Sequence, residues 1–312
     1  MKTMNNKSDV KVLFMGTPEI AKGCLEQMIA DGWNVIGAFT REDKPVGRKQ
    51  VMTPPPVKVC AMEHNIPVYQ PKTLKGEATD IIKELAPDLI VVVAYGRILP
   101  KDVIDVPQYG CVNLHVSLLP KYRGAAPIQW ALINGDKQTG VTVMHIDEGL
   151  DTGDIIDVLP IEIGENETQE ELFADVEEKG RVFLSKVCED IISGTATSTP
   201  QNHAEATLAP PLTKEMALFA FEQPAQVIHN KVRGQNPWPS AHFIFGDKKV
   251  KVIRTKLVDA KGRAGEILST KPLVVACGTG AVELVTVQPE GSKAMDGTAW
   301  SLGRRFAKGD MI

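Results

Sequence analysis

The first two hundred residues of the chain repeat one pattern, in which a short apolar run is followed by a stretch with helical spacing. Five apolar runs predict strands, at Val10–Met15, Trp33–Thr40, Leu89–Ala94, Gly110–Val116 and Gly140–Ile146. The helical stretches include Val57–Asn65, Ala78–Ala86 and Ala126–Asn134. Alternating strands and helices form mostly parallel sheets whose faces are covered by helices. The pattern therefore predicts a Rossmann-like α/β fold.

A longer stretch with helical spacing follows the last of these strands. It predicts an amphipathic helix at Gln169–Ser193, whose buried face holds Leu172, Val176, Val182, Phe183, Val187 and Ile191. The next residues, 194–212, are rich in Thr, Ala and Pro and show little periodicity, which is typical of a linker. We therefore expect a first domain over 1–193, this linker, and a second domain over 213–312.

The second domain is predicted to consist mainly of short strands. These are expected at His242–Phe245, Lys249–Leu257, Gly265–Leu268, Leu273–Ala276 and Val282–Gln288. Turns that contain glycine separate several of them, and five short strands in about 50 residues favour a small barrel. The OB-fold is a common small barrel among nucleic-acid-binding proteins, so we expect a small OB-like β-barrel domain.

Charge is distributed unevenly along the chain. Residues 1–208 hold 20 Lys and Arg against 30 Asp and Glu, whereas residues 209–312 hold 15 against 9. The basic second part favours contact with a polyanion. The alternative is that small domains simply vary in charge, and composition is compatible with both explanations.

Composition also indicates the surroundings in which the chain works. Five scattered cysteines without a CxxC spacing favour a reducing compartment, and argue against a disulfide framework or a cysteine-built zinc site. No apolar run reaches the roughly 18 residues of a membrane helix, and the polar N-terminus does not match a signal peptide. We therefore expect a cytoplasmic protein that binds neither a membrane nor a metal. A monomer is expected, although the sequence does not reveal the oligomeric state.

Two polar side chains interrupt a strand that should be buried. Asn113 and His115 are two residues apart, so they point to the same face near the carboxyl end of the strand. Ligands of open parallel sheets bind beyond these strand ends. A lone histidine here is more often hydrogen-bonded in the core, but the neighbouring Asn and the turn through Arg123–Gly124 favour a site. Asp151, in the sequence GLDTGD, is expected to approach His115, favour its protonated form and fix its orientation.

An amide, an imidazole and a carboxylate without an evident nucleophile favour acyl transfer. No serine lies in a G-x-S-x-G sequence, and the first glycine turn, FMGTPE, lacks the G-x-G-x-x-G of dinucleotide sites. The nucleophile is therefore expected to come from the substrate. The N–H groups of Asn113 and His115 can donate to a developing oxyanion, and the carboxylate–imidazole pair can take a proton from an attacking amine.

The motifs around these residues resemble those of the folate-dependent formyltransferases. The sequence NLHVSLLPKYRGAAP begins at Asn113, and GVTVMHIDEGLDTGD runs from Gly140 to Asp154. FMGTPE, VVVAYGRILP and NPWPS extend the resemblance over nearly the whole chain. Within the family, the chain most closely matches the enzymes that formylate methionyl initiator tRNA for translation initiation. The resemblance implies the formyltransferase fold, 10-formyltetrahydrofolate as donor, and the α-amino group of methionyl initiator tRNA as acceptor.

The same resemblance implies which residues form the site. Asn113, His115 and Asp151 fall on the family's catalytic Asn, His and Asp. The folate pocket is implied to be lined by Val93, Tyr95, Gly96, Arg97, Ile98, Leu99, Ser117, Leu118, Leu119 and Pro120. Residues 41–58 match the family's tRNA-contacting loop, although Glu42 stands where the family's T-x-P-D has Pro. The implied tRNA-binding residues are Arg48, Lys49, Lys248, Lys249, Lys251 and Arg254.

Two other functions are weighed against this one. A related enzyme with a similar second domain formylates an amino-sugar nucleotide; the basic second part of this chain and the 41–58 loop favour tRNA as acceptor. A non-catalytic tRNA-binding protein on a formyltransferase scaffold is the other alternative, and the intact Asn, His and Asp argue against it.

Overall fold

The computed structural model describes residues 6–47 and 49–312. The chain divides into two compact units that exchange segments along the sequence. Unit 1 holds the residues up to 124 together with 140–161 and 175–208, and unit 2 holds 125–139, 162–174 and 209–312. The division into domains at residues 193 and 213 stays a prediction. Within the described ranges, no helix is long and apolar enough to cross a membrane.

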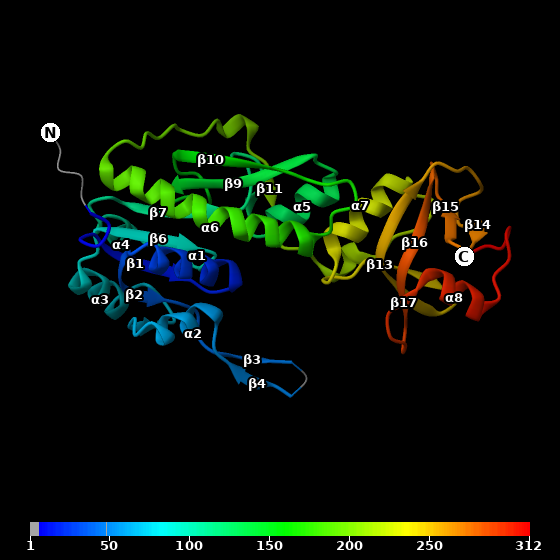
Figure 1. Ribbon diagram of the computed structural model, residues 1–312, viewed down its shortest axis with the longest axis horizontal. Coiled ribbons are helices and arrows are strands. Elements are labelled where there is room, and N and C mark those ends of the chain that lie inside the picture. The colour runs from blue at the N-terminus through cyan, green and yellow to red at the C-terminus, as the bar shows by residue number, and fades with distance from the viewer. Residues whose placement is uncertain (1–5, 48) are drawn as a thin grey trace. The chain divides into compact units, whose positions relative to one another are not determined.

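A seven-stranded sheet runs through unit 1, in the order β10-β9-β7-β6-β1-β2-β5 (Figure 1). Its strands are β1 (Lys11–Gly16), β2 (Asn34–Phe39), β5 (Val68–Tyr69), β6 (Leu89–Val93), β7 (Cys111–His115), β9 (Gln138–His145) and β10 (Ile155–Glu162). Strands β5, β2, β1, β6 and β7 run parallel, whereas β9 is antiparallel to β7. The predicted mostly parallel α/β sheet is confirmed, and β5 and β10 are strands that the prediction lacks.

Helices cover both faces of this sheet. They are α1 (Glu19–Ala30), α2 (Pro56–Glu63), α3 (Glu77–Leu85), α4 (Lys101–Ile104) and α6 (Gln169–Ser193). On one face, Met15, Ile90 and Cys111 belong to a buried cluster that includes residues of α3 and α4. On the other face α1 and α6 lie side by side (Figure 1), with Gly23 of α1 against Glu177 of α6. Because both faces are covered, every residue of β6 is buried.

The helix α6 has the predicted ends, but its buried face differs from the predicted one. Leu172, Val176 and Val187 are buried as expected, whereas Val182 is 55% exposed. The face is completed instead by Leu184, Cys188 and Ile192. The prediction was wrong at Val182 because several apolar residues follow one another there, and periodicity alone does not decide which of them faces the sheet.

The predicted loop at 41–58 contains a ribbon of two antiparallel strands, β3 (Lys44–Val46) and β4 (Val51–Thr53). Lys58 Nζ holds the start of this ribbon in place. It donates to both carboxylate oxygens of Asp43, at 2.8 and 2.9 Å, and to Gln70 Oε1 at 2.9 Å. Hydrogen bonds from Lys58 and Gln70 lower the pKa of Asp43. The ribbon therefore leaves the sheet from a fixed base.

Much of the segment predicted as a linker makes specific contacts. Thr199 forms a reciprocal backbone pair with Ile155, with N–O distances of 2.8 and 2.9 Å, and Gln201 is only 6% exposed. Further along, β11 (Leu208–Ala209) pairs with β8 (Arg123–Gly124). Residues 199–208 are therefore held in place within unit 1.

Unit 2 is built around an antiparallel sheet in the order β12-β13-β16-β15-β14, with β17 paired to β16. Its strands are β12 (His242–Phe245), β13 (Lys248–Val258), β14 (Ile267–Thr270), β15 (Leu273–Ala276), β16 (Ala281–Pro289) and β17 (Met295–Asp296). Its helices are α5 (Pro127–Asn134), α7 (Ala225–Gln235) and α8 (Gly297–Arg304), with a short 3-10 turn at Lys214–Ala217; a second such turn, at His203–Glu205, belongs to unit 1. The predicted C-terminal β domain is confirmed as an antiparallel-sheet domain.

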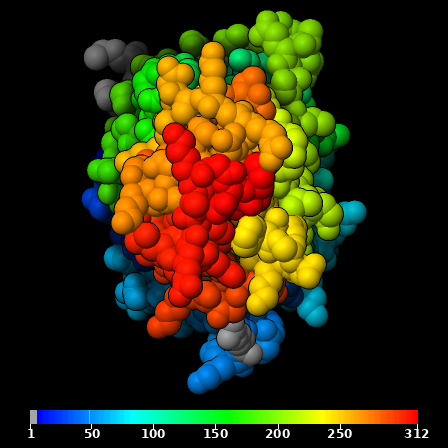
Figure 2. All heavy atoms as spheres, turned by 90° about the vertical axis from the view of Figure 1, so that its right-hand side faces the viewer, coloured from blue at the N-terminus to red at the C-terminus, as the bar shows by residue number. Residues whose placement is uncertain are grey.

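The helix α8 closes one side of this sheet. In Figure 2, α8 and the chain end that follows it, in red, lie on the outer surface of unit 2. Trp300 of α8 packs on Phe243, Phe245 and Phe306, with ring centroids 5.3 to 6.2 Å apart. These aromatic contacts fix the helix to the strands.

A histidine in α7 is buried with both ring nitrogens in use. His229 is 2% exposed; its Nδ1 lies 2.9 Å from Thr255 Oγ1 and its Nε2 lies 3.0 Å from the Glu165 carbonyl oxygen. A carbonyl oxygen only accepts, so Nε2 carries the hydrogen and Nδ1 accepts from the hydroxyl. Burial lowers the pKa of His229.

We predict that stability falls as the pH drops below about 6.5, and that His229 contributes to this fall. The unfolded chain binds a proton at this residue that the folded chain excludes, so the stability contributed by the neutral ring is lost in acid. His229→Gln keeps a donor and an acceptor without a titratable ring, so its Tm should drop less on acidification. An equal drop in the variant and the wild type would contradict this. The exposed His64→Gln is the control.

Candidate active site

Strand β7 carries the two predicted polar residues to the carboxyl edge of the sheet. It lies between β6 and β9. Asn113 and His115 share the face of Cys111, whereas Leu114 lies on the opposite face against Gly180 of α6. The two side chains therefore point away from α6, at the end of the parallel strands where ligands bind.

His115 is buried, and a main-chain contact determines its neutral tautomer. The side chain is 6% exposed, and Nε2 lies 2.9 Å from the carbonyl oxygen of Tyr122. Because that oxygen only accepts, Nε2 carries the hydrogen, and Nδ1 of the neutral ring has a free lone pair. Nδ1 lies 3.7 Å from Asp151 Oδ2. The basic nitrogen of the ring therefore faces the carboxylate.

Asp151 lies in a turn that fixes the direction of its carboxylate. Asp147 Oδ1 accepts from Gly149 N at 2.9 Å and from Thr152 Oγ1 at 2.6 Å, which closes the turn. The φ of Asp151 is +53°, a left-handed value that few residues other than glycine adopt. Its Oδ2 accepts the N–H of Gly124 at 2.8 Å. The structure thus brings the predicted acid and the predicted histidine together.

The three predicted groups do not hydrogen-bond one another. The separation of 3.7 Å between His115 Nδ1 and Asp151 Oδ2 is longer than a hydrogen bond. The Asn113 side chain is half-buried, and no residue in the described ranges hydrogen-bonds its amide. A free donor and a free base therefore lie on the same face of β7.

The cysteines do not offer a nucleophile. All five are buried and unpaired. Burial raises the pKa of Cys111, which precedes Asn113 on β7, to about 12. Burial likewise raises the pKa of Cys60 to about 11, those of Cys188 and Cys277 to about 12, and that of Cys24. In the described part of the chain, no three His, Cys, Asp or Glu side chains are grouped to hold a metal ion.

The segment after β6, which the resemblance assigns to folate, is exposed only in part. Its buried residues are Val93, Tyr95 and Leu99, and its exposed ones are Gly96 and Ile98. Burial raises the pKa of Tyr95, and its hydroxyl has no hydrogen-bond partner among the described residues. Arg97 Nε also lacks one in this set, and the Arg97 guanidinium lies 3.9 Å from Glu42. Both are buried polar atoms, and Arg97 lies close enough to Tyr95 to offset part of the rise in its pKa.

The second segment assigned to folate forms a turn anchored to β9. Ser117 and Leu119 are buried, and Leu118 and Pro120 are half-buried. Thr142 Oγ1 donates to the Ser117 carbonyl at 2.7 Å and accepts from the Leu119 N–H at 3.1 Å. The position of this turn beside His115 is therefore fixed by the neighbouring strand.

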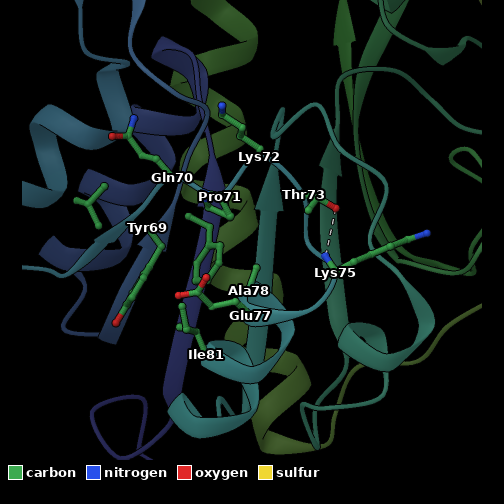
Figure 3. Close-up of a pocket in the computed structure, with 11 residues that line it drawn as sticks. Tyr69, Gln70, Pro71, Lys72, Thr73, Lys75, Glu77, Ala78 and Ile81 are labelled. Carbon is green, nitrogen blue, oxygen red and sulfur yellow. Dashed lines mark hydrogen bonds between the residues drawn. The ribbon is translucent and has the colours of Figure 1, made fainter.

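A cavity of about 410 Å³ lies at another part of the sheet, where β2 and β5 end and α3 begins (Figure 3). It is lined by Phe39, Val68, Tyr69, Gln70, Pro71, Lys72, Thr73, Lys75, Glu77, Ala78 and Ile81. The rings of Phe39 and Tyr69 stack in its wall, with centroids 4.9 Å apart. None of the residues assigned to folate lines this cavity.

The predicted tRNA-binding residues come from both units. Arg48 lies outside the described residues, and Lys49 is exposed in the turn of the β3–β4 ribbon. On β13, Lys248 and Lys249 are exposed and Lys251 is half-buried. Arg254 is exposed as well, but its Nη2 lies 2.7 Å from Glu171 Oε1.

The alternation of β13 decides which of its cations face outward. Val250 and Val252 point inward, so Lys249 and Lys251 point outward, where they line a cavity of about 230 Å³ with residues 288–292. The register shifts beyond Val252. Because of this shift Arg254 also reaches the outer face, although its charge is paired.

Gln201, which lies in the segment interpreted as a linker, was not predicted as a site residue. Its amide donates to the carbonyl oxygen of Asp151 at 3.0 Å. Arg123, expected from the sequence in a ligand-facing turn, is instead 7% exposed and donates to Gln201 Oε1 at 3.1 and 2.6 Å. A polar residue in a Thr- and Pro-rich stretch carries no sign of burial, so only the fold identifies it.

An open α/β sheet with an amide, an imidazole and a carboxylate at its carboxyl edge is suited to an enzyme that transfers an acyl group between two substrates. The sequence model of the Formyl transferase family matches residues 9–188, and that of the Formyl transferase, C-terminal domain, matches 211–305. The chain belongs to the formyl transferase family, and the acyl group that it transfers is a formyl group.

Known relatives match both units of the chain. The methionyl-tRNA formyltransferase of Alkaliphilus oremlandii is 42% identical over 97% of this chain and 99% of its own. The methionyl-tRNA formyltransferase of Clostridioides difficile is 48% identical over 81% of this chain and 82% of its own. A solved N-formyltransferase from Helicobacter canadensis, in complex with folinic acid and dTDP-3-aminofucose, has a TM-score of 0.69 at 20% identity and covers 88% of this chain and 99% of its own. This last likeness shows the shared fold.

We predict that Gly153→Ala disrupts the turn that carries Asp151. A Cβ at Gly153 would collide with the backbone carbonyl of His145, so the turn or β9 must shift. The expected result is a destabilisation of about 1–3 kcal/mol, together with a loss of formyl transfer. Gly303→Ala in α8, where nothing lies within 4 Å of the new methyl group, is the matched control. Equal thermal unfolding midpoints and equal activities for the two variants would contradict the prediction.

Proposed function

We propose that the chain transfers a formyl group from 10-formyltetrahydrofolate to the α-amino group of methionyl initiator tRNA. The observation that carries this proposal is the approach of His115 Nδ1 and Asp151 Oδ2 to 3.7 Å beside an unpartnered Asn113 amide. The relatives named for this activity support the choice of acceptor, because they match the chain over both of its units.

The three side chains take different parts in the transfer. A bond forms between the acceptor nitrogen and the formyl carbon, and the bond from that carbon to the donor nitrogen breaks. His115 Nδ1 is the free base, so it accepts the proton of the attacking amine. Asp151 stabilises the resulting imidazolium, which returns the proton to the leaving nitrogen.

The Asn113 amide is the donor for the negative charge that develops on the formyl oxygen. From their residue types, Asn113 and His115 were expected to share this task. The ring N–H of His115 donates to the Tyr122 carbonyl instead, which leaves the task to the amide. One well-placed donor of this kind contributes about 10²–10³ in rate.

The donor is proposed to contact the segments 93–99 and 117–120. When bound, it supplies a reactive formyl group and a nitrogen leaving group. Arg97, which is half-buried in the first of these segments, is the polar side chain proposed to contact the donor. The exposed Ile98 offers apolar contact to its rings.

The acceptor tRNA is proposed to contact the β3–β4 ribbon and the outer face of β13. Lys49 in the ribbon, and Lys249 and Lys251 on β13, present cations that form no ion pair among the described residues, although the Glu290 carboxylate accepts from the main-chain N–H of Lys249 at 3.4 Å. Arg48 is proposed to act with them. The positive balance of residues 209–312 suits contact with phosphates.

An amino-sugar nucleotide is the alternative acceptor, because a structural neighbour with this fold was solved with such a molecule. It is a much smaller polyanion than tRNA. The positive balance spread over residues 209–312 and the basic ribbon favour the larger acceptor.

We predict that His115→Ala lowers formylation of methionyl initiator tRNA by about 10²–10⁴-fold, because the base is lost. The exposed His64→Ala should keep wild-type activity. Both are assayed with 10-formyltetrahydrofolate, with an amino-sugar nucleotide offered in parallel. Equal activity of the two variants would refute the role of His115. A wild-type chain that formylates the sugar and not the tRNA would refute the acceptor.

We predict that the double variant Lys249→Ala/Lys251→Ala binds tRNA more weakly, and that its affinity depends less on salt. Each lost phosphate contact reduces the slope of log K against log salt by about 1. Lys179→Ala/Lys186→Ala on α6 is the control, because both lysines are exposed and paired with aspartates. Fluorescence anisotropy over a salt series measures the tRNA affinity of both double variants. Equal slopes of log K against log salt in the two variants would contradict the proposed tRNA contact at β13.

A further inference from the structure

Gln201 is a buried side chain whose hydrogen-bonding groups all meet backbone or side-chain partners. Its Nε2 donates to the carbonyl oxygens of Asp151, at 3.0 Å, and Gly153, at 2.8 Å. Its Oε1 accepts from Arg123 Nε and Nη2, at 3.1 and 2.6 Å. One amide therefore connects the turn that carries Asp151 with the strand that carries Arg123.

These contacts act on the backbone that directs the Asp151 carboxylate. The left-handed φ of +53° at Asp151 is sparsely populated for residues other than glycine, so it persists only where the surroundings hold it. Gln201 binds the carbonyl of Asp151 itself and that of Gly153, two residues later. The Nε2 atom of Gln201 therefore holds the peptide units that follow Asp151 and Gly153.

The other end of the amide fixes the second contact of the carboxylate. Asp151 Oδ2 accepts the N–H of Gly124, and Gly124 directly follows Arg123. The Arg123 guanidinium is also within 3.2 to 3.3 Å of His203 Nδ1, so it is held from two sides. Gln201 thus connects Asp151, which bears the carboxylate, with Arg123, which directly precedes the Gly124 whose N–H binds that carboxylate.

We propose that Gln201 is a positioning residue for Asp151, which keeps the carboxylate directed at His115. It acts through hydrogen bonds to the backbone and does not contact the reacting atoms. The inference rests on the proposed function, in which Asp151 stabilises the imidazolium that forms during transfer. Positioning contacts of this kind typically change activity by about 10- to 100-fold.

The donor end of the amide is tested by itself. Gln201→Glu keeps oxygen acceptors for Arg123 but loses the N–H donors to the two carbonyls. The expected result is a fall in kcat of about 10- to 100-fold, with little change in KM or Tm. The exposed Asn166→Ala should match the wild type throughout.

A second measurement needs no substrate. Gln201→Met removes both sets of hydrogen bonds without adding charge, and exchange of the Gly124 amide is followed by NMR in the free protein. Loss of protection at Gly124 that exceeds the loss in the rest of β8 and β11 is expected, because its acceptor, the Asp151 carboxylate, is no longer held.

The two measurements separate the possible failures. Wild-type kcat in Gln201→Glu, or unchanged Gly124 protection in Gln201→Met, would overturn the positioning role. If the wild-type chain itself transfers no formyl group to methionyl initiator tRNA, the proposed function fails, and Gly124 exchange still decides whether Gln201 holds Asp151.

Discussion

The approach of the Asp151 carboxylate to the His115 imidazole is the interaction on which the rest of the site depends. It brings together a residue within a buried strand and a residue in a turn, and each is held by the backbone of residues 122–124. The Tyr122 carbonyl fixes which ring nitrogen is basic, and the Gly124 N–H holds the facing carboxylate oxygen. The short segment after β7 therefore sets both partners at once.

The fold places this pair where a substrate can reach it. Parallel strands β6 and β7 end at the same edge of the sheet, and both faces of the sheet are covered by helices, so the edge is the open side. The antiparallel β9 starts near this edge and runs away from it, and the turn that follows β9 brings Asp151 back to within 3.7 Å of His115. A base and an amide donor lie here without an activated nucleophile, because burial raises the pKa of the nearby Cys111 thiol. Such a site suits a reaction in which one substrate attacks the other directly.

The strand pattern and the site motifs could be predicted because each has a local physical signal. A buried strand reads as a continuous apolar run, and Asn113 and His115 stand out because they interrupt one. The half-exposed strand β10 contains Asp157 and Pro160 and buries little, so it lacks that signal. Val182 was wrongly predicted to be buried because several apolar residues follow one another in α6, and their spacing does not show which of them faces the sheet. Gln201 gains its meaning only from Asp151 and Arg123, which lie far from it in sequence, and no local pattern encodes such a contact.

The central claim is that the protein supplies a base and a hydrogen-bond donor but no nucleophile, so that the acceptor amine attacks the formyl group directly. Intact-protein mass spectrometry after mixing the chain with 10-formyltetrahydrofolate alone tests this claim most directly. The account predicts that the protein mass stays unchanged, and that the formyl group appears only on the methionyl amine once charged initiator tRNA is added. A formyl adduct on the protein that forms with the donor and disappears as the tRNA is formylated would contradict it.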